Sequence, residues 1–407
     1  MKNLLFAICI ASTFQCAAQS NTWTKEMNCG GAARIYPVGF AIGTKGYFAT
    51  GSNASFSILY KDLWEWDQTS NTWTQKMSLP GSARSGAVGF AIGTKGYIGT
   101  GYNGNALNDF WEWDQASNTW APKTTFGGSA RYDAVAFSIG TKGYIGTGSN
   151  GSQEFWEWDQ ATDTWLKKNN FPGAARLGAV GFFIGTKGYI GIGLGNSSTL
   201  NDFWEWDQVS DTWTQKNPFG GVSRYYGAGF SVGTDGYIGT GFDNSNTALK
   251  DFWMWDQATD LWVPKADFGG GYRAFEGGSG SFVIGINGYF GTGIDNSNSL
   301  YNDLWKYQTA DTNTGINAIT WGKEAISIFP NPIVTSATIV FSDNYKEMNP
   351  VAIDVFDLSG KKVKSYIIGN SQNQIKISAS DIGSTGLYIY RVSSNDQVIG
   401  CGKIIIL

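Results

Sequence analysis

Tryptophans that alternate with polar residues form the dominant hydrophobic pattern of the chain. In the stretch L-N-D-F-W-E-W-D-Q-A-S-N-T-W, residues 107–120, Trp111 and Trp113 alternate with Glu112 and Asp114. A period of two residues predicts a β-strand that carries both indoles on one face. The Ser-Asn that follows is expected to turn the chain, and the last tryptophan to open the next strand. An indole pair on one face needs an equally regular partner, and we expect a neighbouring copy of the same unit.

The stretch recurs along most of the chain. The paired tryptophans return at Trp64/Trp66, Trp156/Trp158, Trp204/Trp206 and Trp253/Trp255, and a weaker copy ends at Trp305 and Tyr307. Each unit opens with an arginine: Arg34, Arg84, Arg131, Arg176, Arg224 and Arg273. These arginines are 50, 47, 45, 48 and 49 residues apart. Such a period indicates a repeat architecture in which neighbouring units share their cores.

Each unit predicts four strands. In the unit from Arg84, residues 87–92 form a small, apolar first strand, and a tight turn leads to a second strand at 97–101. A longer loop then leads to the third strand at 110–114 and to the fourth at Trp120. Turn signals between short strands favour an all-β fold.

At these residues the chain resembles the kelch family. The shared pattern is an arginine, an apolar strand, Gly-Tyr, Gly, then Asn-Asp-x-Trp-x-Trp-Asp and Asn-Thr-Trp. The usual Gly-Gly after the second strand is here Thr-Gly, as at Thr100-Gly101. The resemblance covers residues 19–308 and implies a β-propeller with one four-stranded blade per repeat.

The number of blades follows from a count of the fourth-strand tryptophans. These are Trp23, Trp73, Trp120, Trp165, Trp213 and Trp262. Trp23 precedes any complete repeat, whereas the last repeat continues into residues 312–315 without a tryptophan. Joining the surplus strand to the incomplete unit predicts a six-bladed ring that leaves no large sheet edge exposed.

Composition excludes several classes of function. The chain has 407 residues, 15% aromatic residues, 55 glycines and a net charge of -4. The charge argues against a nucleic-acid partner. Because histidine is absent, the commonest general base and a common metal ligand are missing, so we expect neither a metal nor a cofactor. Only two cysteines, Cys29 and Cys401, lie outside residues 1–18, which argues against a disulfide framework.

Residues 1–18 have the features of a secretory signal peptide. Lys2 supplies the positive start, residues 4–14 the apolar core, and Cys16-Ala17-Ala18 a cleavage site of small residues. The apolar run is too short to span a bilayer, so we expect no transmembrane segment. A lipoprotein anchored through Cys16 is the alternative, although Thr-Phe-Gln is a poor lead-in.

The character of the chain changes after a polar linker at residues 309–325. From residue 326 the tryptophan pattern stops, and short strands are expected at 337–341, 351–357, 362–368, 387–392 and 398–406. Turn signals separate these strands and predict a small Ig-like β-sandwich over residues 326–407.

This C-terminal segment resembles the sorting domain of type IX secretion substrates. The matching residues are Phe329-Pro330-Asn331-Pro332, the stretch 355–361, Thr385-Gly386-Leu387-Tyr388, and Lys403 with its apolar tail. The resemblance implies the type IX machinery as a partner, passage across the outer membrane, removal of this domain, and display on the surface or release.

Several motifs that suggest chemistry have simpler interpretations. Gly43-Thr44-Lys45-Gly46 and its copies are hairpin turns, since a phosphate loop needs a longer glycine-rich span before a helix. The glutamates at 65, 112, 157 and 205 repeat, which no single catalytic acid would do. The six arginines are expected to orient the blade junctions through backbone carbonyls, with ligand binding as the alternative. Residues 243–246 and 295–298 resemble half of a calcium loop, but they lack its Gly and distal Glu and favour turns.

One face of the predicted propeller is nearly constant across the repeats, and the other varies. The variable loops are residues 52–61, 102–108, 149–154, 194–201, 242–250 and 294–302. Residues that follow the arginines also vary and should surround one mouth of the channel. We therefore predict ligand contacts from Tyr36, Tyr132, Asp133, Tyr225, Tyr226, Phe275 and Glu276.

Two classes of function remain open from the sequence, besides a structural surface protein without a ligand. The first is an exported module that binds a glycan or protein. The alternative is a hydrolase or isomerase that acts on carbohydrate in the channel, for which Asp133 and Glu276 are the only acid pair to name. Copper oxidases of kelch architecture need histidine ligands, and sialic-acid enzymes use dispersed polar residues that one sequence does not identify. No set of nucleophile, base and orienting residue stands out.

Overall fold

A computed structural model describes most of the chain. The described residues are 21–149, 151–274, 280–309, 326–329, 333–341, 351–357, 361–368, 374–394 and 397–406. The chain divides into two compact units, Met1–Ala310 and Asp311–Leu407. The predicted leader and residues 310–325 of the predicted linker lie outside the described residues.

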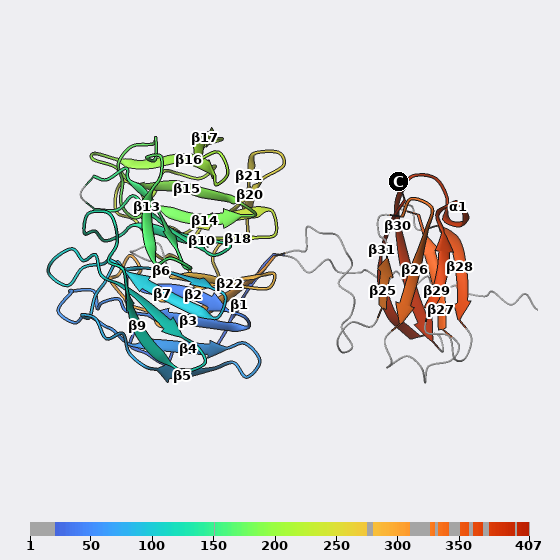
Figure 1. The fold of residues 1–407 in the computed structure, drawn as a ribbon, viewed down its shortest axis with the longest axis horizontal. Helices are drawn as coiled ribbons and strands as arrows, with labels where there is room; N and C mark the ends of the chain where they lie inside the picture. Colours follow the sequence, from blue (N-terminus) through green and yellow to red (C-terminus); the bar gives the residue numbers. More distant parts are fainter. Residues whose placement is uncertain are drawn as a thin grey trace, which may run out of the picture. The chain divides into compact units, whose positions relative to one another are not determined.

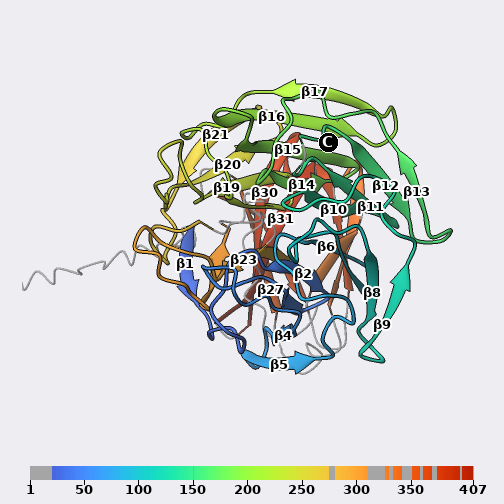
Figure 2. The same cartoon turned by 90° about the vertical axis from the view of Figure 1, so that its left-hand side faces the viewer.

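The first unit consists of six four-stranded antiparallel sheets, the blades of a propeller (Figure 2). Blade 1 contains β2 (Val38–Ile42), β3 (Lys45–Ala49), β4 (Leu63–Asp67) and β5 (Thr72–Lys76). Blade 2 contains β6 (Val88–Ile92), β7 (Lys95–Gly99), β8 (Phe110–Asp114) and β9 (Thr119–Lys123). Blade 3 contains β10 (Val135–Ile139), β11 (Lys142–Gly146), β12 (Phe155–Asp159) and β13 (Thr164–Lys167).

The remaining blades repeat this order. Blade 4 contains β14 (Val180–Ile184), β15 (Lys187–Leu194), β16 (Thr199–Asp207) and β17 (Thr212–Lys216). Blade 5 contains β18 (Ala228–Val232), β19 (Asp235–Gly239), β20 (Phe252–Asp256) and β21 (Leu261–Lys265). Blade 6 contains β22 (Ser281–Ile284), β23 (Asn287–Gly291) and β24 (Leu304–Gln308), and its outer strand is the N-terminal β1 (Thr22–Lys25). The all-β, six-bladed fold predicted from the sequence is confirmed.

Each blade packs on the preceding one through an aromatic pair. In blades 1 to 5 the second indole of the repeat is fully buried and contacts a second-strand tyrosine of the blade before it, as Trp158 contacts Tyr97 with ring centroids 4.8 Å apart. Trp66 contacts Tyr289 at 5.0 Å, so the pattern continues across the ring closure. The neighbouring copy is therefore the partner of the indoles, as the sequence predicts.

The glycine of each Gly-Tyr pair makes this close packing possible. A Cβ atom on Gly143 would lie 2.1 Å from the Phe90 ring of the preceding blade, and one on Gly96 would lie 2.5 Å from Phe40. Only a residue without a side chain allows such an approach of strand and ring.

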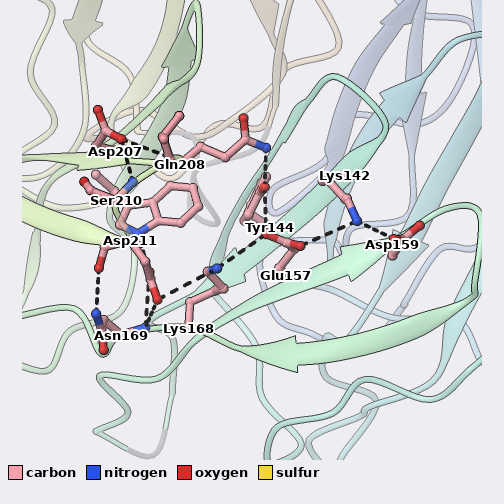
Figure 3. A network of polar contacts seen from close by, with 12 residues as sticks. Lys142, Tyr144, Glu157, Asp159, Lys168, Asn169, Asp207, Gln208, Ser210 and Asp211 are labelled. Carbon is pink, nitrogen blue, oxygen red and sulfur yellow. Dashed lines mark hydrogen bonds and ion pairs between the residues drawn. The ribbon is translucent and has the colours of Figure 1, made fainter.

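A polar network joins neighbouring blades on the side of the short turns (Figure 3). Tyr144 donates its hydroxyl proton to Glu157 at 3.0 Å, and Gln208 of the next blade donates to the Tyr144 hydroxyl at 2.7 Å. Lys142 pairs with Asp159 and also lies 3.6 Å from Glu157. The recurring glutamates therefore serve the blade junctions.

A buried arginine clamp holds the opposite end of each blade. Arg34, 0% exposed, donates to the Thr50 carbonyl at 2.8 Å and forms a bidentate pair with Asp62 at 2.6 and 2.7 Å. Trp64 donates to the same carboxylate at 2.7 Å. The six arginines pair with Asp62, Asp109, Glu154, Asp202, Asp251 and Asp303. The predicted carbonyl contacts are present, and the carboxylate partner was not predicted.

The carbonyl acceptor of each clamp belongs to a residue with a left-handed backbone. These residues are Thr50, Thr100, Thr147, Ile192, Thr240 and Thr292, with φ between 53° and 67°. They occupy the first position of the pair that is Gly-Gly in the kelch pattern and here is Thr-Gly, or Ile-Gly in blade 4. A β-branched residue in this conformation costs roughly 1–3 kcal/mol, so the arginine clamps hold strained backbone in place.

The second unit is a small two-sheet structure (Figure 1). One sheet has the order β25 (Ile326–Phe329), β26 (Ser336–Phe341), β29 (Gln374–Ser378). The other has the order β28 (Lys362–Ile368), β27 (Val351–Phe356), β30 (Gly386–Ser394), β31 (Gln397–Ile406), and α1 spans Ala379–Ile382. Ile339, Ile353, Val355, Val392 and Ile404 are 0% exposed in the core. The predicted β-sandwich is therefore present.

The closing blade reverses an ion pair found in other blades. In blade 1, Glu65 on the third strand lies 3.3 Å from Lys76 on the fourth. In blade 6 the third strand carries Lys306, which lies 3.2 Å from Glu26 beyond the end of β1. Glu26 stands three residues after Trp23, as Lys76 stands three residues after Trp73. The reversal makes the N-terminal segment complementary to blade 6. If this segment paired with the third strand of blade 1 instead, Glu26 would face Glu65.

We expect charge reversal at this closure to be rescued by its reciprocal. Glu26→Lys should lower the free energy of unfolding by about 1–2 kcal/mol, because it faces Lys306 with a like charge in a largely buried site. The double variant Glu26→Lys/Lys306→Glu should recover most of that loss, since it restores the arrangement of blade 1. Thermal and urea unfolding of the three proteins check this. A double variant no more stable than Glu26→Lys would contradict it.

The clamp carboxylates should make the propeller sensitive to acid. Burial by itself would raise the pKa of Asp62, but hydrogen bonds and charge attraction from Arg34 outweigh it and hold that pKa below its ordinary value. The same balance lowers the pKa of Asp109, Asp202 and Asp251. A depressed pKa stabilises the fold above the unfolded value of about 4, and this contribution is lost as the pH falls further.

Removing one clamp tests its contribution. Arg84→Met should lower the free energy of unfolding by about 3–5 kcal/mol, because it leaves Asp109 and a buried carbonyl without their cation. Between about pH 5 and pH 2, the free energy of unfolding of the variant should also fall less than that of the parent. Without Arg84, the pKa of Asp109 is lowered less by folding. Lys250→Met is the control, since its exposed pair with Asp267 should contribute below about 1 kcal/mol. Urea unfolding at several pH values measures these differences. Equal losses of unfolding free energy in the two variants would contradict a stabilising role of the clamp.

Candidate functional site

The propeller axis contains a cavity of about 390 Å³ lined by the first strand of every blade. Its wall is formed mainly by small residues, such as Gly39, Gly89 and Ala136, together with phenylalanine rings. No carboxylate belongs to the lining among the residues that the structure describes.

The hydroxyl groups of this cavity are used between blades. Ser138 donates to the Ala91 carbonyl at 2.8 Å, and Ser281 donates to the Gly229 carbonyl at 2.8 Å. Ser231 makes the equivalent bond to Phe183 at 2.5 Å. The polar groups of the wall thus support the ring, and the cavity presents small apolar side chains.

In blades 1 to 5, the second residue after the clamp arginine narrows one mouth of the axis. Tyr36, Gly86, Asp133, Gly178 and Tyr226 all have φ between 53° and 61°. Their backbones are joined from blade to blade: Asp133 donates to Gly86 at 2.9 Å, Gly178 to Asp133 at 3.1 Å, and Tyr226 to Gly178 at 2.8 Å. Among the described residues these bonds run from blade 2 to blade 5, and we call these residues, together with Tyr36 of blade 1, the mouth ring.

Side chains from alternate blades meet inside this ring. Tyr226 donates its hydroxyl proton to Asp133 at 2.7 Å, and its ring lies 5.3 Å from that of Tyr36. Gly86 and Gly178 leave the necessary room, because a Cβ atom there would lie 2.4 Å from the Asp133 carboxylate and 2.6 Å from the Tyr226 ring. Burial, reinforced by the charge of Asp133, raises the pKa of Tyr226 well above its ordinary value.

The structure thus divides the predicted site residues into three groups. Tyr36, Asp133 and Tyr226 are 9%, 3% and 7% exposed and belong to the ring that narrows the mouth. Tyr132 and Tyr225 are half-buried and accessible on the loop-bearing face. The remaining predicted residues, Phe275 and Glu276, lie outside the described residues.

Loop aromatics extend the accessible part of this face. Tyr132 packs on Tyr102 with centroids 5.2 Å apart. Tyr225 lies 5.7 Å from Phe242 and donates its hydroxyl proton to Asn246 at 2.6 Å.

Phe56 is a further aromatic side chain of this face that is not among the residues predicted from the sequence. It is 44% exposed, and its ring lies 5.5 Å from Tyr36. The ring contacts Tyr36–Tyr226 and Tyr225–Tyr226 then continue the series to Tyr225. Together these rings make an aromatic band across the mouth, from blade 1 to blade 5. The available signal was a phenylalanine between two serines, Ser55 and Ser57, in a loop.

The loops that resemble half a calcium site are capped turns. One oxygen of Asp243 accepts the backbone N–H groups of Ser245 and Thr247 at 2.8 and 2.9 Å, and Asp295 does the same in blade 6. Asn296 also accepts the Ala248 N–H at 2.6 Å and so fastens blade 6 to blade 5. Among the described residues, no group of three or more His, Cys, Asp or Glu could hold a metal ion.

Comparisons with known proteins agree with both units. Residues 327–407 match the family described as a secretion system C-terminal sorting domain. No curated protein matches the chain. A solved structure described as "Structure of YjhT" aligns with a TM-score of 0.58 at 14% identity, covering 67% of this chain and 94% of that one. At this identity the likeness shows the fold alone.

The C-terminal match also bears on where the protein resides. In the part of the chain that the structure describes, no helix is long and apolar enough to cross a membrane. A type IX sorting domain directs its carrier to the cell surface or the medium. The chain is therefore an exported six-bladed β-propeller that ends in a secretion system C-terminal sorting domain.

Proposed function

We propose that this protein is an exported binding module whose loop-bearing propeller face takes a glycan or protein ligand. The observation that carries the proposal is the aromatic band across the mouth, with its accessible ends at Phe56 and at Tyr225 beside Phe242. Aromatic rings bury a large area with little loss of side-chain freedom, which is why they serve as binding anchors.

The supporting structure suits such a role. Tyr226 is held by its backbone hydrogen bond to Gly178 and by Asp133, and Tyr36 packs edge-on against the Tyr226 ring. Because these buried rings are fixed, the accessible aromatics above them are preorganised, and ordering them on binding costs little. The opposite face has tight turns that are nearly the same in every blade, and their side chains are occupied by the junction network.

A carbohydrate-active enzyme with its site in the channel is the alternative, and the described residues give it less support. Of the acid pair named from the sequence, Asp133 is 3% exposed and accepts the Tyr226 hydroxyl proton. Most glycoside hydrolases use two carboxyl groups, one on each side of an accessible glycosidic bond. We therefore favour binding without turnover.

Two accessible tyrosines separate binding from structural roles. Tyr132→Ala and Tyr225→Ala should each make the free energy of ligand binding less favourable by roughly 1–3 kcal/mol, while leaving the melting temperature nearly unchanged. A ligand is first recovered from glycan and protein arrays and then measured by calorimetry. Val209→Ala is the matched control, since Val209 is 87% exposed in a turn of the opposite face.

The proposal fails if the ligand binds both tyrosine variants as tightly as it binds the parent. It also fails if the Val209 variant loses affinity while the tyrosine variants keep it, because the ligand would then bind the face of the short turns.

The second unit should be needed for export and dispensable for the propeller fold. Deleting residues 326–407 should leave the protein in the periplasm of its native host, because the type IX machinery no longer recognises it. Cell fractionation locates the protein, and circular dichroism with thermal melting reports whether the propeller is intact. Normal amounts of the truncated protein at the surface would contradict a sorting role.

A further inference from the structure

The loop that carries Phe56 has the same turn as two loops in other blades. The Phe56 N–H donates to the Asn53 carbonyl at 3.1 Å, as Asn246 donates to Asp243 at 3.0 Å in blade 5 and Asn298 to Asp295 at 3.1 Å in blade 6. All three residues adopt a left-handed backbone, with φ of 56°, 59° and 63°. Phe56 therefore occupies the position that asparagine takes in the other two loops.

This substitution runs against local preference. Asparagine tolerates the left-handed region, whereas a bulky side chain there is an outlier. The phenylalanine is nevertheless 44% exposed, so burial of its ring compensates only in part. An unfavourable residue that stays partly exposed on a binding face points to a role outside folding.

The loop is built to keep its conformation. Asn53 accepts the Ile58 N–H at 3.1 Å and donates its side-chain amide to Ser57 at 2.9 Å. Ser55 and Ser57 are joined through their hydroxyls at 2.9 Å. On its inner side the Phe56 ring rests on Tyr36, which leaves the outer side of the ring available.

The chemistry around Phe56 favours a neutral ligand. Its loop offers amide and hydroxyl groups and one exposed lysine, Lys61, at its end, whereas the arginines of the face are fully buried and paired with carboxylates. Lys250, in the blade 5 loop, is paired with Asp267. A ligand rich in carboxylate or sulfate groups would lack the bidentate guanidinium partners that bind such groups best.

A pyranose ring matches what this face presents. One side of the sugar is a patch of C–H groups that packs on an aromatic ring, and its rim of hydroxyls suits amides and hydroxyls. The two accessible ends of the band, Phe56 and Tyr225, would contact separate sugars of one chain. We infer that Phe56 is a sugar-stacking residue and that the ligand class of this face is a neutral oligosaccharide, an inference that rests on the proposed function.

The variant Phe56→Asn tests the inference because it installs the residue of the equivalent loops. We expect a melting temperature within about 2 °C of the parent, or above it, since strain is relieved as a ring contact is lost. Affinity for a neutral oligosaccharide should fall at least about tenfold, as expected for a lost anchor. Phe56→Tyr keeps the ring and should stay within about threefold of the parent. Val209→Asn, on the opposite face, should bind like the parent.

The probes are chitohexaose, cellohexaose, laminarihexaose and mannohexaose, with alginate and chondroitin sulfate hexasaccharides as anionic counterparts. Each is titrated by calorimetry into the secreted chain from residue 19 onward and into its variants. Binding of at least one neutral probe with the stated order of variants supports the inference. Binding of the anionic probes alone, or of none of the six, overturns it.

The variants also distinguish this inference from the function on which it rests. If an array ligand is lost in Tyr132→Ala and Tyr225→Ala but kept in Phe56→Asn, the role of Phe56 is wrong and the binding face stands. If none of the three variants weakens that ligand, both fail. A large fall in the melting temperature of Phe56→Asn would show that the phenylalanine serves packing, and that too overturns the inference.

Discussion

The buried pairing of an arginine with a carboxylate is the interaction on which this propeller depends. In each blade the guanidinium is fully desolvated and satisfies a carboxylate together with the carbonyl of a residue in a left-handed conformation. A buried charge is tolerated only when its partners are complete. The clamp therefore fixes two segments of each blade. These are the end of the second strand and the residues that lead into the first strand.

The candidate site follows from that constraint. In blades 1 to 5 the clamp holds the residues just after the arginine beside the axis, where Tyr36, Asp133 and Tyr226 meet. Glycines at Gly86 and Gly178 make room for the larger side chains of the alternate blades. Small differences among six nearly identical units thus create one asymmetric mouth, while the shared residues maintain the ring.

Much of the fold could be predicted because it repeats. The period-two tryptophans indicated the strands, the arginine spacing defined the units, and the surplus Trp23 strand predicted how the ring closes. The clamp carboxylates were harder to assign, because Asp62 and its equivalents are adjacent to the tryptophans in sequence but reach the arginine only after the blade has folded. Their positions are fixed by tertiary contacts that a pattern of hydrophobic and polar residues does not encode.

The site was predictable only in part. The sequence identified the positions after the arginines, but it gave no means of telling Tyr132, which is accessible, from Tyr226, which is buried and bonded to Asp133. Phe56 was missed for a related reason: its significance depends on the turn that it shares with Asn246 and Asn298, and that equivalence needs the hydrogen bonds of the loops. Burial and backbone conformation, rather than residue type, separate the roles.

Hydrogen–deuterium exchange with and without a bound ligand tests the central claim, that the loop-bearing face is the binding face. The account predicts slower exchange in the loops around residues 52–61 and 242–250 when the ligand is present. It predicts unchanged exchange in the turns at 43–46 and 93–96, on the other side. Protection of those turns, with the loops unchanged, would contradict the account.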